Sequence, residues 1–129
     1  MGNVGPMSCV EMFFDPGCPW TWITSRWLCE VAHKRGLDVR WRTYSLMLKN
    51  ADNPSVASAA RERWAAQFDA LRVIEAAREL VGEDAVGKLY AAFGTAIHLE
   101  GDSFLSSLEE RVNAAGVDAA VLVARGSTR

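Results

Sequence analysis

The chain contains 129 residues, of which 50% are hydrophobic and 23% are charged, and its formal net charge at pH 7 is −2. A chain of this length and composition suits one folded domain with one core and argues against disorder. The small net charge, without a block of lysine and arginine, excludes the usual signature of a protein that binds nucleic acid. No apolar run approaches the length of about 20 residues that spans a bilayer, so we expect no membrane contact and a cytoplasmic location.

The first predicted element is a short strand over residues 10–14, which is apolar and β-prone. Turn residues at 15–17 end this strand, and Pro19 suits the first position of a helix because its missing N–H would be unpaired there anyway. Cys18 is therefore expected at the helix N-cap. A sulfur at this position faces unpaired backbone N–H groups and the positive end of the helix dipole, which favour the thiolate. We expect Cys18 to ionise more readily than a free cysteine and to act as a nucleophile.

The chain has three cysteines, an odd number that cannot form a complete disulfide framework. Cys18 and Cys29 would lie about 16 Å apart along one helix, too far for a disulfide, which needs Cα atoms about 4.4–6.8 Å apart. Cys9 within the strand and Cys29 within the helix are interpreted as small buried side chains, the common state of a free cysteine. Cys29 and His33 have the spacing of a helical metal-ligand pair, but no second pair completes a tetrahedral site, so no metal is predicted.

The helix is predicted to continue over 21–36, with Gly36 as its C′ residue. Its apolar residues form one stripe that we expect to pack on a sheet, namely Ile23, Trp27, Leu28, Val31 and Ala32. Residues 37–46 alternate between apolar and polar, which predicts a half-exposed strand at a sheet edge. Strand, helix and strand with this spacing form a βαβ unit with parallel strands, which puts Cys18 at the carboxyl end of the first strand.

The rest of the chain is predicted to be a loop and then mainly helical. The loop covers 47–54, and helices follow over 55–82, 83–99 and 103–115, with a short last helix capped by Asp118. Residues 121–123 are the late strand candidate.

Four side chains outside the turn are candidate ligand contacts. Asn50 lies in the predicted loop, where it would either contact substrate or stabilise a turn. His98 lies near the end of a helix, where the dipole favours a histidine, or alternatively acts as a base. Trp20 and Trp22 would either form an aromatic wall for a flat substrate or pack in the core.

The segment 15–27, which reads Asp-Pro-Gly-Cys-Pro-Trp-Thr-Trp-Ile-Thr-Ser-Arg-Trp, resembles the active-site segment of DsbA-like thioredoxin-fold oxidoreductases, and particularly of mycothiol-dependent nitroreductases. The similarity continues more weakly to near Arg125. Members of that group usually have Cys-Pro-Trp-Cys, whereas this chain has Thr21 in place of the second cysteine. The resemblance therefore implies a monothiol site, in which the Thr21 hydroxyl can bind the Cys18 sulfur but cannot displace a bound partner.

The resemblance implies an α/β fold with a thioredoxin-like, DsbA-type βαβ unit at 8–46 and a helical lid subdomain at 55–125, between tails at 1–7 and 126–129. In that family the lid covers the cysteine and shapes the substrate pocket. A complete domain of this type continues, after the helical insert, with two strands, a helix and a cis-proline loop beside the cysteine. The last proline of this chain is Pro54, so we expect the second half of the thioredoxin fold to be missing and the chain to be C-terminally truncated.

The function that the resemblance implies is thiol-disulfide exchange or thiol-dependent reduction, with Cys18 and Thr21 as catalytic residues. The expected co-substrate is mycothiol or glutathione, and no bound cofactor is expected. The expected substrate is a nitroaromatic compound, another small molecule or a disulfide. The expected substrate contacts are Pro19, Trp20, Trp22, Asn50 and His98.

Two alternatives stay open. A kappa-class glutathione transferase or isomerase-like enzyme shares this fold, although its usual residue at the position of Cys18 is serine. A non-catalytic fragment or interaction module is the other alternative, favoured by the missing half. The apolar first strand is expected to need a neighbour on each side, so an open edge would pair with a second copy, giving a homodimer, or with a complementary fragment.

Overall fold

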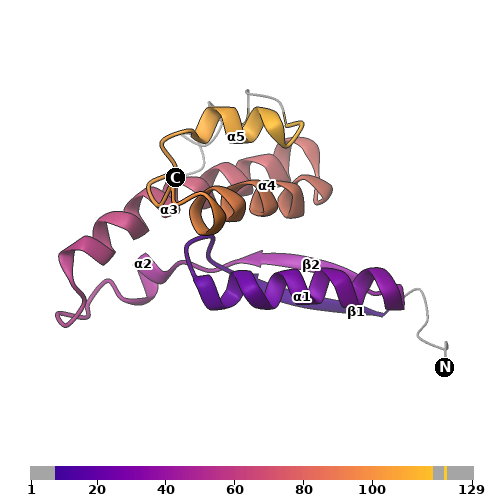
Figure 1. Cartoon of the computed structure of the whole chain (residues 1–129), viewed down its shortest axis with the longest axis horizontal. Helices are drawn as coiled ribbons and strands as arrows, with labels where there is room; N and C mark the ends of the chain where they lie inside the picture. Colours follow the sequence, from indigo (N-terminus) through magenta and orange to yellow (C-terminus); the bar gives the residue numbers. More distant parts are fainter. Residues whose placement is uncertain (1–7, 118–120, 122–129) are drawn as a thin grey trace.

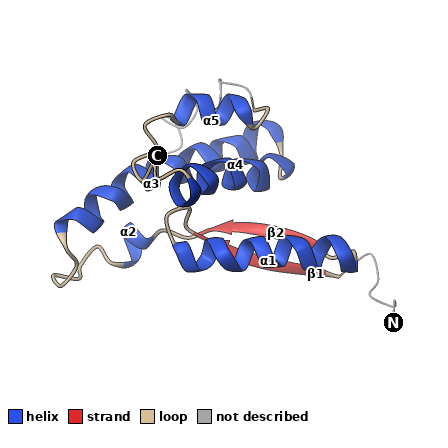
Figure 2. Ribbon diagram, in the orientation of Figure 1, coloured by secondary structure: helices blue, strands red, loops and turns tan. Residues whose placement is uncertain are grey.

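The computed structural model describes residues 8–117 and residue 121. The elements (Figure 1, Figure 2) follow in the order β1 (Cys9–Phe14), α1 (Pro19–Arg35), β2 (Asp38–Thr43), α2 (Leu46–Lys49), α3 (Ser58–Val81), α4 (Asp84–Gly94), the π-helix η1 (Thr95–Leu99) and α5 (Leu108–Ala114). The predicted tails, the cap at Asp118 and residues 122–123 of the predicted late strand lie outside the described residues. Val121 is described, and it is helical rather than extended, which corrects the strand prediction at that residue.

β1 and β2 form a parallel two-stranded sheet whose residue pairs run from Cys9 with Asp38 to Phe14 with Thr43. α1 connects the two strands and lies along the sheet (Figure 1), so the predicted βαβ unit is confirmed. Gly36 ends α1 with a φ of 67°, a left-handed conformation that glycine adopts without strain. The arrangement is α/β and consistent with part of a thioredoxin-like fold.

The core lies where α3 and α4 pack together and cover the carboxyl ends of the strands. Tyr90 of α4 is fully buried, and its ring stacks on Phe14 with centroids 4.1 Å apart. Trp22 and Trp41 meet the same ring edge to face, at 5.6 and 5.5 Å. Gly94 permits this approach, since a Cβ there would lie 2.1 Å from the Trp22 ring. The aromatic rings therefore fix α1, α4 and both strands relative to one another.

α1 buries a different face from the predicted one. Leu28 and Ala32 are buried as expected, but Ile23 is 62% exposed and Trp27 is 60% exposed. Trp22 and Ser25 are buried instead. The sheet under α1 has two strands in the described residues, and α1 also packs sideways against α4 through Trp22, so the outer half of the apolar stripe is left uncovered.

The two faces of β1 differ in exposure. Alternate residues from Val10 to Phe14 face the helices and are half-buried or buried, while the residues between them, and Cys9, are exposed. The interpretation of Cys9 as buried is therefore wrong, because no described segment covers its face of the sheet. Cys29 is half-buried rather than buried, and all three cysteines are free.

Some helix boundaries also differ from prediction. β2 ends at Thr43, before the predicted end of the strand at residue 46, and α2 begins at Leu46 and extends into the predicted loop at 47–54. Ser45 Oγ accepts the N–H of Leu48 at 3.2 Å and starts this short helix. α3 begins at Ser58, later than predicted, and α4 with η1 accounts for the helix predicted at 83–99. None of the helices in the described ranges is both long and apolar enough to cross a membrane.

α5 begins at Leu108 rather than at residue 103. The reason is Asp102, whose carboxylate accepts hydrogen bonds from the backbone and hydroxyl groups of Ser106 and Ser107. Leu105, between them, has a φ of 50°, which a helix does not allow. Local side-chain hydrogen bonds thus hold this segment in turns where helical periodicity predicted a longer helix.

Candidate active site

The turn between β1 and α1 holds Cys18 at the start of the helix. The backbone N–H of Cys18 donates to the carbonyl of Asp15 at 3.0 Å, and the N–H of Trp22 donates to the carbonyl of Cys18 at 3.0 Å. Cys18 is extended, with φ −82° and ψ 113°, and Pro19 follows as the first helical residue, so the predicted N-cap position is confirmed. The thiol is half-buried and makes no capping hydrogen bond within the described residues. The sulfur belongs to the residue at the positive end of the α1 dipole.

Asp15 fixes this turn with a side chain that is 3% exposed. One carboxylate oxygen accepts the N–H of Gly17 at 2.9 Å, and the other accepts the N–H of Leu46, the first residue of α2, at 2.8 Å. Burial raises the pKa of Asp15, while the two backbone hydrogen bonds and the charge of His98 act in the opposite direction. Sequence reasoning treated Asp15 only as a strand breaker. The available signal was its spacing of two residues before glycine, which is typical of an Asx-turn.

His98 contacts the same turn from η1. Its Nε2 lies 2.8 Å from the carbonyl oxygen of Pro16, and because a carbonyl only accepts, Nε2 carries the donated proton. The ring also stacks on Trp22, with centroids 5.6 Å apart and planes at 24°. His98 therefore ties η1 to the active-site turn. The Nε2 atom is engaged as a donor, which does not fit a general base at that nitrogen.

Arg26 and Tyr90 form a polar layer beside Trp22. The Arg26 guanidinium lies over the Trp22 ring, 4.2 Å from its centroid, and its Nε donates to Ser25 Oγ at 3.2 Å. Burial raises the pKa of Tyr90 to about 12. The Ser25 hydroxyl and the Arg26 charge oppose this shift, whereas the ionisable groups of the turn add to it. Tyr90 is therefore a neutral hydroxyl at physiological pH. Sequence reasoning missed this layer because Arg26 falls on the helix face predicted to be polar.

Comparison with known proteins assigns the family. Residues 17–128 match the model of the Rv2466c-like family, described as "Mycothiol-dependent nitroreductase Rv2466c". The chain belongs to the Rv2466c-like family. It is also similar to the "Uncharacterized protein Rv2286c" of Mycobacterium tuberculosis, with 28% identity over 125 residues. That alignment covers 89% of this chain and 52% of the relative, so the chain spans about half the length of that relative.

In this Rv2466c-like protein, the other predicted site residues take different positions. Pro19 and Trp20 stand exposed on the first turn of α1, Trp20 by 77%, and Thr21 is half-buried there. Asn50 ends α2, and its Nδ2 donates to the carbonyl of Leu46 at 3.0 Å, which is turn chemistry, the second of its two predicted roles. Within the described ranges, no three potential metal ligands are grouped.

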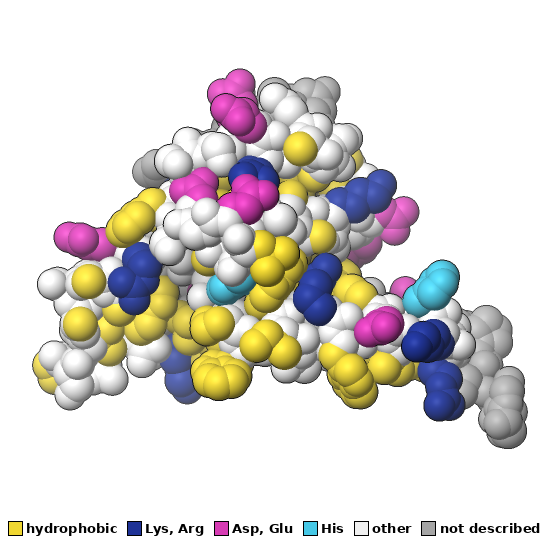
Figure 3. All heavy atoms as spheres, viewed as in Figure 1, with side chains coloured by type: hydrophobic (Ala, Val, Ile, Leu, Met, Phe, Trp, Pro, Cys, Tyr) yellow, Lys and Arg dark blue, Asp and Glu magenta, His cyan; other side chains and the backbone are white. Residues whose placement is uncertain are grey.

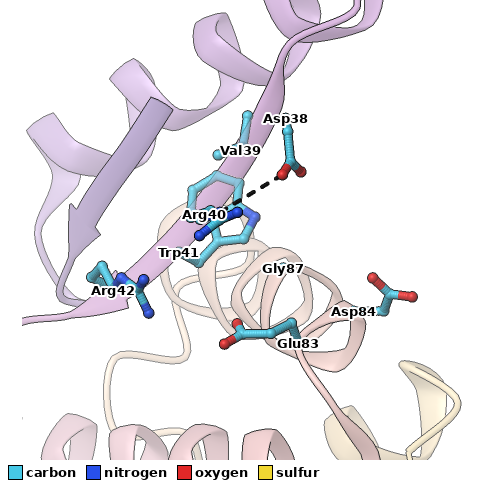
Figure 4. A pocket seen from close by; sticks show the side chains of 8 residues that line it. All are labelled: Asp38, Val39, Arg40, Trp41, Arg42, Glu83, Asp84 and Gly87. Atoms are coloured by element: carbon cyan, nitrogen blue, oxygen red, sulfur yellow. Dashed lines mark ion pairs between the residues drawn. The ribbon is translucent and has the colours of Figure 1, made fainter. Parts of the chain in front are cut away.

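Two hollows adjoin β2 in the described part of this Rv2466c-like chain. The larger, about 540 Å³, lies between the outer edge of β2 and the start of α4, and none of its lining residues belongs to the active-site turn. Trp41 and Gly87 form part of its wall (Figure 4), and Arg40 pairs with Asp38 across 3.8 Å at its rim.

The smaller hollow, about 250 Å³, is mainly apolar and lies between the end of β2, α2 and α3. Its lining residues are Thr43, Tyr44, Ser45, Leu48, Phe68, Leu71, Arg72 and Glu75. Its lining includes Ser45, and the next residue, Leu46, donates its N–H to Asp15 of the active-site turn.

Proposed function

We propose that this protein is a thiol-dependent reductase of the Rv2466c-like family and that Cys18 is its nucleophile. The observation that carries the proposal is the position of Cys18 at the N-cap of α1. The turn before Cys18 is bonded to α2 through Asp15 and to η1 through His98. A helix N-terminus stabilises a thiolate through its unpaired N–H groups and its dipole. The family description, which names mycothiol, supports a low-molecular-weight thiol as co-substrate.

The proposed reaction is thiol-disulfide exchange. The Cys18 thiolate attacks one sulfur of a disulfide, so a bond forms between Cys18 and that sulfur while the other sulfur leaves as a thiolate. A free thiol, mycothiol in the first instance and glutathione as the alternative, then attacks the outer sulfur of the mixed disulfide. Cys18 leaves as a thiolate. The net change of one cycle is that the free thiol replaces one of the two thiols of the starting disulfide. Nitroaromatic compounds are the second substrate class that the family description suggests.

Thr21 gives the proposed site its monothiol character. Its half-buried side chain lies in the first turn of α1, where the hydroxyl can donate to the Cys18 thiolate but cannot form a disulfide. We propose that the exposed ring of Trp20 stacks on a flat substrate beside Pro19.

The remaining predicted contacts are proposed to act through the turn, as positioning residues. Trp22 supports the His98 ring, His98 binds the Pro16 carbonyl, and Asn50 stabilises α2, which Asp15 joins to the turn. The hydrogen bond from His98 to Pro16 links the helices within 55–125 to a DsbA-type βαβ unit at 8–46. This link supports a role for these helices as a lid over the active-site turn.

A non-catalytic interaction module is the second candidate function. It is favoured by the large apolar side chains exposed on α1. An interaction module has no need of a reactive Cys18, and this difference separates the two functions experimentally.

The test is mass spectrometry of the reduced protein after incubation with oxidised mycothiol, and in parallel with oxidised glutathione. We expect one adduct, on Cys18, although Cys9 is the more exposed thiol. Cys18→Ser should abolish the adduct, and Cys29→Ser, the matched control on the same helix, should retain it. An adduct found only on Cys9 or Cys29 would contradict the enzymatic proposal and favour the interaction module.

A further inference from the structure

We infer that the outer edge of β1 and the exposed apolar stripe of α1 form one interface through which two copies of this chain pair about a twofold axis. The stripe consists of Trp20, Ile23 and Trp27. This pairing needs no reaction at Cys18, so it stands or falls separately from the proposed nucleophile, and it replaces the substrate contact proposed for Trp20.

The outer edge of β1 has no strand paired with it in the described part of the chain. The carbonyls of Ser8 and Phe14 accept backbone N–H groups from the two ends of the β2 segment, at 3.1 and 2.8 Å. In a parallel ladder the backbone groups of alternate residues point to the same side, so the even-numbered residues of β1 bond to β2. The N–H and C=O groups of Cys9, Glu11 and Phe13 therefore point away from β2, and no strand within the described residues pairs with them.

The C-terminal half of the outer edge of β2 is occupied instead by side chains of α3. Arg78 Nη2 donates to the carbonyl of Trp41 at 2.8 Å, and the Thr43 hydroxyl donates to Glu75 at 3.0 Å. Arg78 also bonds to Glu75 at 3.2 Å and pairs with Glu83. Blocking one edge with charged side chains is a common protection against sheet pairing. The edge available to a partner strand is therefore that of β1.

The outer face of α1 is apolar. Trp20 is 77% exposed, Ile23 is 62% exposed and Trp27 is 60% exposed, and their spacing puts them on one face of the helix. A shallow apolar hollow of about 470 Å³ continues past Trp27 to Val31. Hydrophobic side chains gather along the lower margin of the molecule, where α1 and β1 lie (Figure 3). A continuous row of this size marks an interaction site, whereas single exposed apolar residues do not.

A second copy covers the edge and the stripe together. If two β1 strands pair antiparallel about an axis at Glu11, Cys9 of one copy lies opposite Phe13 of the other, and every unpaired residue of both edges is bonded. Opposite residues lie on one face of a sheet, so both α1 helices cover the same face of the combined sheet and their stripes adjoin. The two Glu11 side chains lie opposite each other at the axis, and the ion pair of each with Arg42 at 2.9 Å reduces the repulsion between them.

The available area suits a specific dimer. The three stripe side chains are each more than half exposed. They offer on the order of 400 Å² per copy, since one aromatic side chain buries about 150–250 Å². Two copies together with the paired backbone reach about 1,000 Å², the lower range for a specific interface.

The first test is light scattering of the purified 129-residue chain, for which we expect a dimer. Trp27→Glu should weaken dimerisation about thirtyfold or more, the usual effect of removing a central interface tryptophan. Leu80→Glu is the matched control, because Leu80 is a 54% exposed apolar residue of α3. It should leave dimerisation unchanged.

The second test traps the register by mild oxidation. In a chain with Cys18→Ala and Cys29→Ala, adding Phe13→Cys should give an intermolecular disulfide between positions 9 and 13. The same chain with Phe13 retained is the control and should stay uncrosslinked. A folded monomer at every concentration would overturn the proposal and assign this face to a different polypeptide. A dimer that neither crosslinks in this way nor weakens with Trp27→Glu would also overturn it.

Discussion

Cys18 owes its position to hydrogen bonds made by its neighbours rather than by its own side chain. Asp15 binds the turn to the first residue of α2, and His98 binds Pro16, directly within the turn. Both side chains bond to backbone groups, so the turn is fixed independently of what reacts at the sulfur. In the proposed reaction, Thr21 decides how a bound thiol leaves, because it stands where the resembled two-cysteine sites have their second cysteine.

Thr21→Cys is expected to convert a stable adduct on Cys18 into a transient one. The new thiolate, in the first turn of α1, would attack the Cys18 sulfur and release the bound thiol as a thiolate, leaving one intramolecular disulfide. Mass spectrometry after incubation with oxidised mycothiol should detect the disulfide and no adduct. Thr24→Cys, one turn further along α1, is the control and should keep the adduct. Persistence of the adduct in the Thr21→Cys protein would contradict the proposed geometry.

The N-cap position of Cys18 could be predicted from the sequence because the signals around it are local. A strand-breaking turn and Pro19 act on residues next to them in the chain, and they predict an N-cap without any tertiary information. The contacts of Asp15 with Leu46 and of His98 with Pro16 join residues 31 and 82 positions apart. Such contacts depend on how α2 and η1 pack, which hydrophobic periodicity does not report.

At the level of elements, the buried face of α1 also depends on tertiary packing that the sequence pattern does not report. Its apolar spacing predicted a buried face, but periodicity identifies an apolar face and not whether a partner lies against it. Trp22 is buried because α4 comes close, and that approach depends on Gly94, whose meaning no helix pattern reveals. The βαβ unit itself was predictable, since strand alternation and helix caps are read from neighbouring residues.

Gly94→Ala is expected to destabilise the protein. A Cβ at this position would lie 2.1 Å from Trp22, and the strain of overpacking, about 1–3 kcal/mol, exceeds the gain of at most about 1 kcal/mol in helix propensity. Chemical denaturation of the variant measures the change in free energy of unfolding. In a Trp22→Phe background the shorter side chain lacks the distal indole ring that makes the contact, so the same change should be neutral or stabilising. Equal effects in both backgrounds would argue against this close contact.

Asp102 sets the start of α5, and its stabilising effect should depend on pH. Slight burial raises the pKa of Asp102, but the hydrogen bonds from Ser106 and Ser107 outweigh it, so the pKa lies below its ordinary value of 3.8. A lowered folded-state pKa stabilises the fold above the unfolded pKa, and this contribution is lost as the pH falls through the folded pKa.

We therefore expect the wild-type free energy of unfolding to fall below pH 3.8 partly through Asp102, and Asp102→Asn to lack that component. Chemical denaturation across acid pH measures it. Asp52→Asn, an exposed aspartate in the loop after α2, is the matched control and should follow the wild-type profile. Parallel profiles for wild type and Asp102→Asn would show that these hydrogen bonds do not stabilise the carboxylate.

For the whole molecule, the decisive feature is the difference between its two sheet edges. A two-stranded sheet is marginally stable by itself, and here one edge is bonded by α3 while the other is free within the described residues. One free edge allows a closed twofold pair, whereas two free edges allow strands to add without limit. The size of the proposed assembly therefore depends on Arg78, which lies outside the proposed interface.

Arg78→Met should open the second edge. It leaves the carbonyl of Trp41 without its donor and Glu75 without its cation, so we expect a loss of about 1–3 kcal/mol in unfolding free energy, the usual effect of an unsatisfied buried group. We also expect light scattering to rise steadily with concentration, because the assembly no longer closes at two copies. Arg111→Met is the matched control, since Arg111 pairs with Glu100 at the surface and has no hydrogen bond to either described strand. Circular dichroism should show both variants folded, so that scattering reports association and not unfolding. A folded Arg78→Met protein that remains a dimer at every concentration would show that this side chain does not protect the β2 edge.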